Sequence, residues 1–162
     1  MEAVLRIPPG SSLSACGHAL LAFWTWLGRT LEALSVFATY WDSRVIFGLV
    51  SKEAVNERLA ASAPGTFIVR VSESCAGQLA LALAQAGGKV QHSLITPTGT
   101  QGAVSVLMGS GPATFSSLGA FIEQCHVLVA LWPAVTCEVF IRAMWADLAV
   151  VLRNVPSSVG PT

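Results

Sequence analysis

Arg70 is the residue whose chemistry is most informative, because it stands inside an apolar, strand-like run. That run, Thr66–Ser72 (TFIVRVS), is rich in β-branched and aromatic residues, which favours a β-strand. Alternate side chains of a strand share a face, so Ile68 and Ser72 point to the same side as Arg70. A charge in a central strand is costly unless it meets an opposite charge, either an internal carboxylate or a bound anion. The internal carboxylates to consider are Glu53, Glu57 and Glu73.

A turn of small and polar residues follows Arg70 directly and favours a bound anion. Residues 72–74 (SES) lead into 75–77 (CAG), a turn that can aim backbone N–H groups and hydroxyls at an anion. Lys52, at the start of a predicted helix, can add a second positive charge. Arginine suits such a site because its planar fork can hold a phosphate through two parallel hydrogen bonds. The sequence therefore indicates a local phosphate site.

The sequence offers little for other chemistry. It contains no P-loop, G-x-S-x-G, H-E-x-x-H or Rossmann glycine pattern, so we expect neither an enzyme nor a cofactor. Cys16, Cys75, Cys125 and Cys137 form no CxxC pair and lack zinc spacing with the histidines, so we expect reduced thiols and no metal site. The net charge of the 162 residues is zero, which weakens direct nucleic-acid binding. The apolar stretch at 19–28 is too short to span a membrane, so no membrane partner is expected.

Apolar spacing predicts the elements that must position the site. Residues 15–38 carry apolar side chains at helical intervals, and Ser51 is a good N-cap for a second helix beginning with KEAVNERLAA. Gly87-Gly88 indicates a hairpin turn in an antiparallel meander. The predicted strands of this meander are Thr66–Ser72, Gln78–Ala84 and Lys89–Ile95.

The C-terminal half of the chain is less regular. Residues 96–114 are rich in Gly, Ser, Thr and Pro, and we expect a loop there with at most a small strand at Val104–Met108. Helical spacing then runs from Phe115 to Cys125, with Ser116 or Ser117 as the cap. A last helix is predicted from Glu138 to Arg153, where the apolar residues form one stripe.

These elements together resemble a Src homology 2 (SH2) domain. Residues 41–74, from Trp41 through a turn and helix to PGTFIVRVSES, look like the opening of that domain. The segment HSLI at 92–95 resembles its histidine-bearing strand, and FSSLGAFIEQC at 115–125 resembles its second helix.

Within that family the closer likeness is to the signal transducers and activators of transcription (STATs). Both GLVSKE at 48–53 and PGTFIVRVSES at 64–74 are similar to STAT segments. Upstream, FWTWLGRTLEAL at 23–34 resembles the end of the helical STAT linker domain. The likeness covers roughly residues 20–133 and does not include a STAT coiled-coil or DNA-binding domain.

The resemblance implies an α+β fold, with a central antiparallel β-sheet flanked by two α-helices and preceded by a helical linker segment. It divides the chain into a flexible lead-in (1–14), a helical linker segment (15–40), an SH2 domain (41–135), a C-terminal helix (136–155) and a disordered tail (156–162).

The resemblance also implies a phosphotyrosine site. Arg70 matches the arginine that grips the phosphate, and Lys52 matches the basic residue of the first helix. The loop contributes Ser72 and Ser74 as phosphate-contacting hydroxyls, with Glu73 between them, and His92 matches the histidine beside the phosphotyrosine ring. Taken without the resemblance, His92 is more simply a hydrogen-bonded residue of the sheet.

Tyrosine usage departs from the STAT pattern. STATs dimerise by exchanging a phosphotyrosine segment that follows this domain, whereas the single tyrosine here, Tyr40, precedes it. Tyr40 fits a packing role better than a phosphorylation site, so the reciprocal STAT dimer is not expected.

Two functions stay open on the sequence. The first is a phosphotyrosine-peptide binding module of intracellular signal transduction, whose partner is a tyrosine-phosphorylated protein or peptide. The resemblance to STATs implies that the protein acts in the cytoplasm. It also implies a link to the nucleus and to the regulation of transcription. The second is a protein-assembly module with a vestigial phosphate pocket, which self-associates through the apolar stripe of 138–153. The composition, 53% hydrophobic and 11% charged, favours a protein partner.

Overall fold

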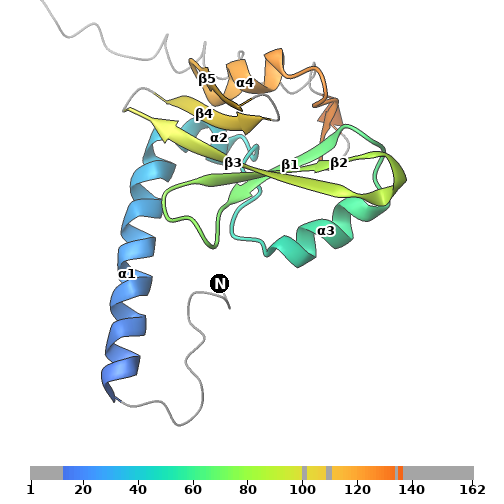
Figure 1. Ribbon diagram of the computed structural model, residues 1–162. Helices are drawn as coiled ribbons and strands as arrows, with labels where there is room; N and C mark the ends of the chain where they lie inside the picture. Colours follow the sequence, from blue (N-terminus) through green and yellow to red (C-terminus); the bar gives the residue numbers. More distant parts are fainter. Residues whose placement is uncertain (1–12, 100–101, 109–110, 134, 137–162) are drawn as a thin grey trace, which may run out of the picture.

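A computed structural model of the protein describes residues 13–99, 102–108, 111–133 and 135–136 (Figure 1). The first element, α1 (Leu13–Val36), is a long helix that extends away from the rest of the fold. The short helix α2 (Ala38–Asp42) follows it, and α3 (Lys52–Ala60) comes before the main strands. The last described helix is α4 (Leu118–Gln124). None of the described helices is long and apolar enough to cross a bilayer.

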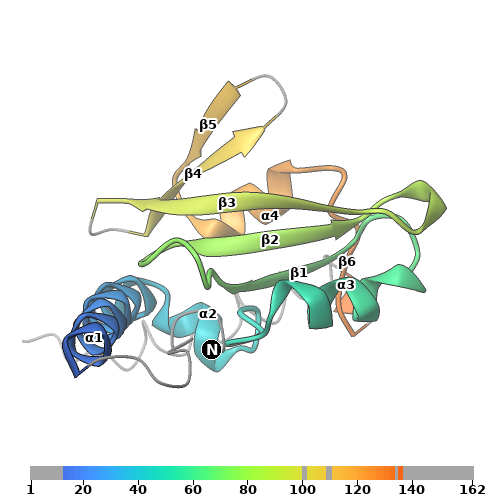
Figure 2. The ribbon, with the colours of Figure 1, turned by 60° about the horizontal axis from the view of Figure 1, so that its bottom comes forward.

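Seven described strands form one sheet, in the order β5-β4-β3-β2-β1-β6-β7 (Figure 2). They are β1 (Thr66–Val71), β2 (Leu79–Ala84), β3 (Val90–Thr98), β4 (Ala103–Met108), β5 (Gly111–Phe115), β6 (Ala130–Leu131) and β7 (Val135–Thr136). Neighbouring strands are antiparallel, except that β6 runs parallel to β1. The predicted α+β fold is therefore confirmed, with one parallel pair in a mostly antiparallel sheet.

Helices α3 and α4 cover opposite faces of the sheet (Figures 1 and 2). On one face, Val55 and Leu59 of α3 are buried in a cluster with Ile68 of β1 and Ala82 of β2. On the other face, α4 contributes to a larger cluster that also includes side chains of α1. Its largest fully buried members are Phe37, Phe67, Phe121, Leu79, Ile95, Leu118 and Ile122.

Strand β1 lies between β2 and β6 and is buried along its whole length. A strand covered on both faces takes a nearly continuous apolar sequence, as TFIVRV does here. Arg70 is the only charged residue in it. The position of the strand therefore imposes burial on this charge.

Two helix caps and one turn that were predicted from the sequence are present in the structure. The Ser51 Oγ accepts a hydrogen bond from the Ala54 N–H at 3.1 Å and begins α3, and the Ser117 Oγ accepts from the Ala120 N–H at 3.0 Å and begins α4. Each bond satisfies an N–H that has no partner inside the helix. The glycine pair 87–88 turns β2 into β3, with φ of 76° and 72°, values that side chains rarely adopt.

The small strand predicted at Val104–Met108 is confirmed as β4, but the loop predicted for the remainder of residues 96–114 is wrong where strands β3 and β5 occupy it. Strand β3 continues to Thr98, and β4 pairs with β5 in a hairpin. Val104 and Val106 are buried on one face of β4. The alternation of apolar and polar residues therefore indicated a strand more reliably than the content of small residues indicated a loop. Phe115 ends β5 and pairs with Val104, so α4 begins three residues later than the helical spacing predicted, at Leu118.

Other predictions fall outside the described residues. These are the C-terminal helix at 138–153, the tail at 156–162 and most of the lead-in at 1–14. The limits assigned to the segments of the chain remain predictions.

Candidate functional site

Arg70 lies on the α3 side of the sheet, one residue before the end of β1. Its Cα pairs with Ala80 of β2, and its residue surface is only 6% exposed. The next pairs on this face join Ile68 to Ala82, and Ala82 to His92 of β3. On this face, Ala80 and Ala82 of β2 therefore lie between Arg70 of β1 and His92 of β3, and the side chain of each is only a methyl group.

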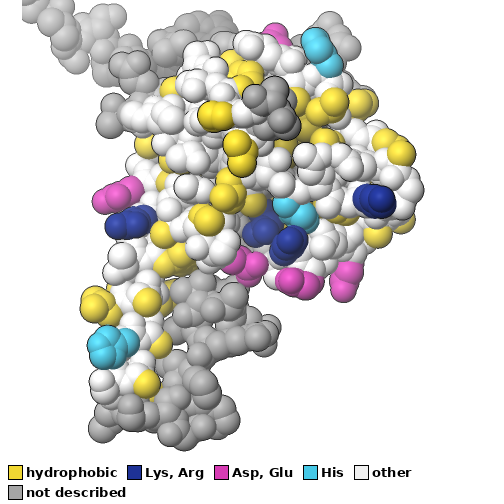
Figure 3. Space-filling model, in the orientation of Figure 1, with side chains coloured by type: hydrophobic (Ala, Val, Ile, Leu, Met, Phe, Trp, Pro, Cys, Tyr) yellow, Lys and Arg dark blue, Asp and Glu magenta, His cyan; other side chains and the backbone are white. Residues whose placement is uncertain are grey.

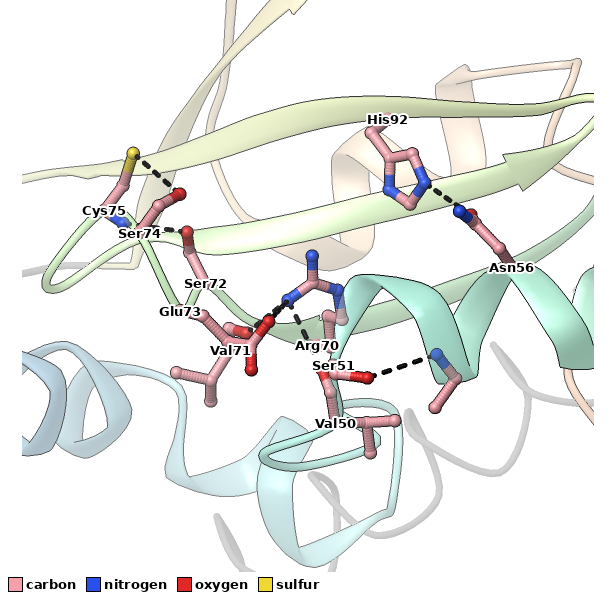
Figure 4. A network of polar contacts seen from close by, with 11 residues as sticks. Val50, Ser51, Asn56, Arg70, Val71, Ser72, Glu73, Ser74, Cys75 and His92 are labelled. Carbon is pink, nitrogen blue, oxygen red and sulfur yellow. Dashed lines mark hydrogen bonds and ion pairs between the residues drawn. The ribbon is translucent and has the colours of Figure 1, made fainter. Parts of the chain in front are cut away.

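The hydrogen bonds of Arg70 hold one edge of its guanidinium. Nη1 donates to the carbonyl oxygens of Val71 at 3.1 Å and of Val50 at 3.3 Å (Figure 4). Nε is buried and has no hydrogen-bond partner among the described residues. A second terminal nitrogen points away from these carbonyls, toward the side of the site where His92 lies (Figure 4). The guanidinium therefore keeps donor capacity that the described residues do not use.

One of the three carboxylates considered from the sequence forms an ion pair with Arg70. The Glu73 Oε2 lies 3.9 Å from the Arg70 Nη1, which is too long for a hydrogen bond. Burial lowers the pKa of the Arg70 guanidinium, and the carboxylates of Glu73 and Glu53 act in the opposite direction. Arginine nevertheless stays charged at neutral pH. Arg70 is therefore a buried cation with a loosely placed internal counter-charge.

The loop after β1 is shaped by its serines. The buried Ser72 Oγ accepts a hydrogen bond from the Cys75 N–H at 3.1 Å, which holds the turn closed. Ser74 is exposed, with its Oγ 3.7 Å from the Cys75 Sγ. Of the two predicted phosphate-contacting hydroxyls, Ser72 thus already has a structural role, whereas Ser74 is accessible to a ligand.

Helix α3 brings two polar residues to the site. Lys52 occupies the first position of the helix and is exposed. Asn56, one turn later, has its Oδ1 2.8 Å from the His92 Nε2. Because a carbonyl oxygen can only accept, this Nε2 carries the proton and donates. Asn56 was not predicted, although its position four residues after Lys52 places both on one side of the helix.

His92 is a neutral ring with one open nitrogen. Burial lowers the pKa of His92, and the positive charges of Lys52 and then Arg70 lower it further, while Glu53 opposes them. With the proton on Nε2, Nδ1 is an acceptor, and it is buried without a hydrogen-bond partner among the described residues. The charges of Lys52 and Arg70 therefore both act on His92.

The structure therefore gathers the predicted site residues at one place. Arg70 and Glu73 form an ion pair, the charges of Lys52 and Arg70 both act on His92, and Ser72 and Ser74 belong to the adjoining loop. In the space-filling view, basic groups and a histidine lie side by side on the face formed by α3 and the sheet (Figure 3). Within the described ranges, no group of three or more His, Cys, Asp or Glu side chains could hold a metal ion.

A central sheet between two helices, with a buried arginine in an inner strand, defines a class of binding module. The sequence model described as the SH2 domain matches residues 46–124. The chain therefore contains an SH2 domain, which is a binding module and not a catalytic one.

This domain is distantly similar to the SH2 regions of STATs. Signal transducer and activator of transcription A of Dictyostelium discoideum is 33% identical over 86 residues, which are 50% of this chain and 12% of that protein. Signal transducer and activator of transcription 6 of Homo sapiens is 34% identical over 61 residues, which are 37% of this chain and 7% of that protein. The chain thus spans only a small part of the relatives that it matches.

Among solved structures, the SH2 domain of a CRK/CRKL homolog (crka1) from Monosiga brevicollis aligns with a TM-score of 0.40 and 28% identity. The alignment covers 47% of this chain and 66% of that one.

Proposed function

We propose that this domain binds tyrosine-phosphorylated peptides and that Arg70 grips the phosphate. The observation that carries the proposal is the buried guanidinium, whose Nε has no hydrogen-bond partner among the described residues and whose ion pair with Glu73 is 3.9 Å long. A phosphate brings up to two negative charges and three acceptor oxygens, which complement this arrangement. Charge-assisted hydrogen bonds of this kind are about twice as strong as neutral ones.

The surroundings of Arg70 fit a phosphate monoester on an aromatic ring. Lys52 adds a positive charge from the solvent side, and the loop 72–75 adds the Ser74 hydroxyl. The alanine methyls of β2 leave an apolar floor between Arg70 and His92. A phenyl ring can lie on this floor beside the neutral imidazole, while its phosphate meets the cations.

Beyond the phosphate, the peptide can reach an apolar pocket on the opposite face of the sheet. This pocket has a volume of about 100 Å³ and is lined by Leu81, Leu83, Val106, Phe121 and Leu128, among others. Strand β4 pairs with β3 only over Ile95–Thr98, so the edge of β3 at residues 90–94 is not covered by β4. A peptide that crosses β3 there passes from His92 to the pocket, where an apolar side chain would fit.

A role in signalling follows from the same proposal. The names of the relatives place those proteins in signal transduction and in the activation of transcription. For this chain we propose phosphotyrosine recognition in intracellular signalling, in the cytoplasm with access to the nucleus.

Titration with a library of phosphotyrosine peptides tests the function. The same peptides without phosphate, and with phosphoserine in place of phosphotyrosine, are the controls. We expect saturable binding only to the phosphotyrosine set, because phosphoserine is too short to reach Arg70 across the alanine floor. Equal binding to all three sets would contradict the proposal.

A further inference from the structure

Helix α1 lies against the loop that follows Arg70. This loop, residues 72–78, joins β1 to β2 and lies beside α1 in both ribbon views (Figures 1 and 2), and we call it the β1–β2 loop. The approach is closest at Gly77, where a Cβ atom would stand 3.1 Å from the carbonyl oxygen of Arg29 and 3.6 Å from its Cβ. Cβ atoms rarely make contacts as short as 3.1 Å, so the loop needs a glycine to come this close to the helix.

Small side chains extend the contact around Gly77. On the loop, Ala76 packs against the main core cluster, to which Trp26 of α1 belongs. On the helix, Ala33 is buried and lines a groove together with Ala76 and Gly77. Because protein interiors are close-packed, a loop held against a helix in this way is restricted on that side by the helix.

The β1–β2 loop is a closed turn, so its position at Gly77 affects its position beside Arg70. Three hydrogen bonds close the turn: the Ser72 N–H donates to the Gln78 carbonyl oxygen at 3.0 Å, the Gln78 N–H to the Cys75 carbonyl oxygen at 3.2 Å, and the Cys75 N–H to the Ser72 Oγ at 3.1 Å. The same turn carries Ser74 and Glu73, whose carboxylate pairs with Arg70. A displacement of Gly77 away from α1 would therefore also move Glu73 and Ser74 relative to the guanidinium.

We propose that α1 is a positioning element of the phosphate site and that it holds the β1–β2 loop beside Arg70 through the contact at Gly77. This inference rests on the proposed function, because it assigns the loop a part in holding the phosphate. The loop offers the Ser74 hydroxyl and backbone N–H groups, and such donors contribute most when they are in place before the ligand binds.

The proposal makes phosphate affinity depend on a helix outside the matched SH2 segment. Helix α1 ends at Val36, whereas the SH2 model matches residues 46–124. Coupling between two parts of a protein is reciprocal. A change that moves α1 therefore alters the affinity for phosphate, and a bound phosphopeptide in turn holds α1 more firmly.

Gly77→Ala tests the close contact, with Gly87→Ala as the matched control. The two glycines have φ of 74° and 76°, so alanine strains the backbone similarly at both positions, but nothing lies within 4 Å of the Cβ position at Gly87. At a temperature where both variants are folded, we expect Gly77→Ala to bind a phosphotyrosine peptide at least about fivefold more weakly and Gly87→Ala to bind as before. Equal affinities of the two variants would overturn the proposal.

Ala33→Gly tests the same contact from the helix, with Ala22→Gly as its control. Both lie in α1, so glycine lowers the stability of the helix to a similar extent, but Ala22 is exposed and Ala33 is buried beside the loop. Both changes are mild, so this pair keeps the test open if Gly77→Ala does not fold. We expect about twofold to fivefold weaker phosphopeptide binding for Ala33→Gly alone. Equal effects of the two variants would contradict a positioning role of α1.

A double variant separates positioning of the loop from a general loss of stability. When the loop is displaced, the Glu73 carboxylate no longer stands beside the phosphate. Glu73→Gln should therefore improve phosphopeptide affinity less in the Gly77→Ala chain than in the unmodified chain. The same improvement in both chains would mean that Gly77→Ala does not act through the loop.

Hydrogen exchange of the loop amides without any peptide distinguishes this inference from the proposed function. The amides of Cys75 and Gln78 are hydrogen-bonded within the turn, and we expect them to exchange at least about tenfold faster in Ala33→Gly than in Ala22→Gly. Unchanged exchange in a chain that binds phosphopeptide would overturn the inference alone. Faster exchange in a chain whose unmodified form binds no phosphopeptide would overturn the proposed function, while the contact of α1 with the loop would stand.

Discussion

The Arg70 Nη1 and the Glu73 Oε2 lie 3.9 Å apart at the end of β1, so the buried arginine and the loop that follows it form an ion pair. This carboxylate stands where a bound phosphate would place its own negative charge. Glu73 therefore stabilises the charge of Arg70 in the free domain, and in the proposed complex it would oppose the phosphate.

Glu73→Gln should tighten phosphotyrosine-peptide binding by about threefold to tenfold, since it removes a repulsion of roughly 0.7–1.4 kcal/mol near the surface. The neutral amide keeps the size of the side chain and the backbone N–H of the loop. Isothermal titration with one phosphopeptide measures the change, and Glu123→Gln on α4 is a control far from the loop. Weaker binding would mean that the Glu73 carboxylate holds the loop in its binding conformation.

Lys52→Ala should weaken phosphopeptide binding modestly, by about twofold to fivefold, because an exposed cation contributes only about 0.5–1 kcal/mol. The salt dependence of the affinity should also fall, since one charge fewer faces the phosphate. Lys89→Ala, an exposed lysine on the β2–β3 turn, is the control. If both variants bind alike at low and high salt, Lys52 has no part in the site.

His92 should make the domain less stable in mild acid. Its pKa is lowered in the folded state, so the unfolded chain takes up a proton first as the pH falls. The free energy of unfolding therefore keeps its full value above the pKa of His92 in the unfolded chain, about 6.5, and declines as the pH falls below it. Urea unfolding at several pH values between 8 and 5 measures this decline, and His92→Gln should reduce it. An unchanged pH dependence in that variant, with exposed His126→Gln as the control, would assign the decline to other groups.

Ser93→Trp should separate recognition of the phosphate from recognition of the peptide. Ser93 lines the apolar pocket on β3, so a tryptophan there would fill the pocket without touching the Arg70 face. We expect a phosphopeptide to bind at least tenfold more weakly, while phenyl phosphate binds as before. Thr114→Trp on the edge strand β5 is the control. Equal losses for both ligands would mean that the substitution distorts β3.

Much of the candidate site could be predicted from the sequence because it is local. Arg70 and the loop that follows it are contiguous, and the cap at Ser51 fixes the start of α3 beside them. The contact between His92 and Asn56 joins residues 36 positions apart, and it depends on the register of β2 with β3 and on the packing of α3. Neither this strand register nor the packing of α3 can be derived from the spacing of residues within one segment.

The hairpin of β4 and β5 could not be predicted from composition. Small residues are typical of a loop, so the composition of this segment favoured one. In the structure, Val104 and Val106 are buried in the larger core cluster and β4 pairs with β5. The hydrogen bonds from Arg70 to the carbonyl oxygens of Val50 and Val71 could not be predicted either, because every residue type has a backbone carbonyl group.

The most direct test of the account compares the unmodified chain with Arg70→Ala by titration against one phosphotyrosine peptide, with exposed Arg44→Ala as the control. Removing one member of a buried, charge-assisted pair costs about 2–5 kcal/mol, so we predict a loss of at least about thirtyfold for Arg70→Ala alone. Thermal unfolding of each variant should verify that it is folded. If a folded Arg70→Ala domain binds the phosphopeptide as tightly as the unmodified chain, Arg70 does not hold the phosphate and the proposed function is contradicted.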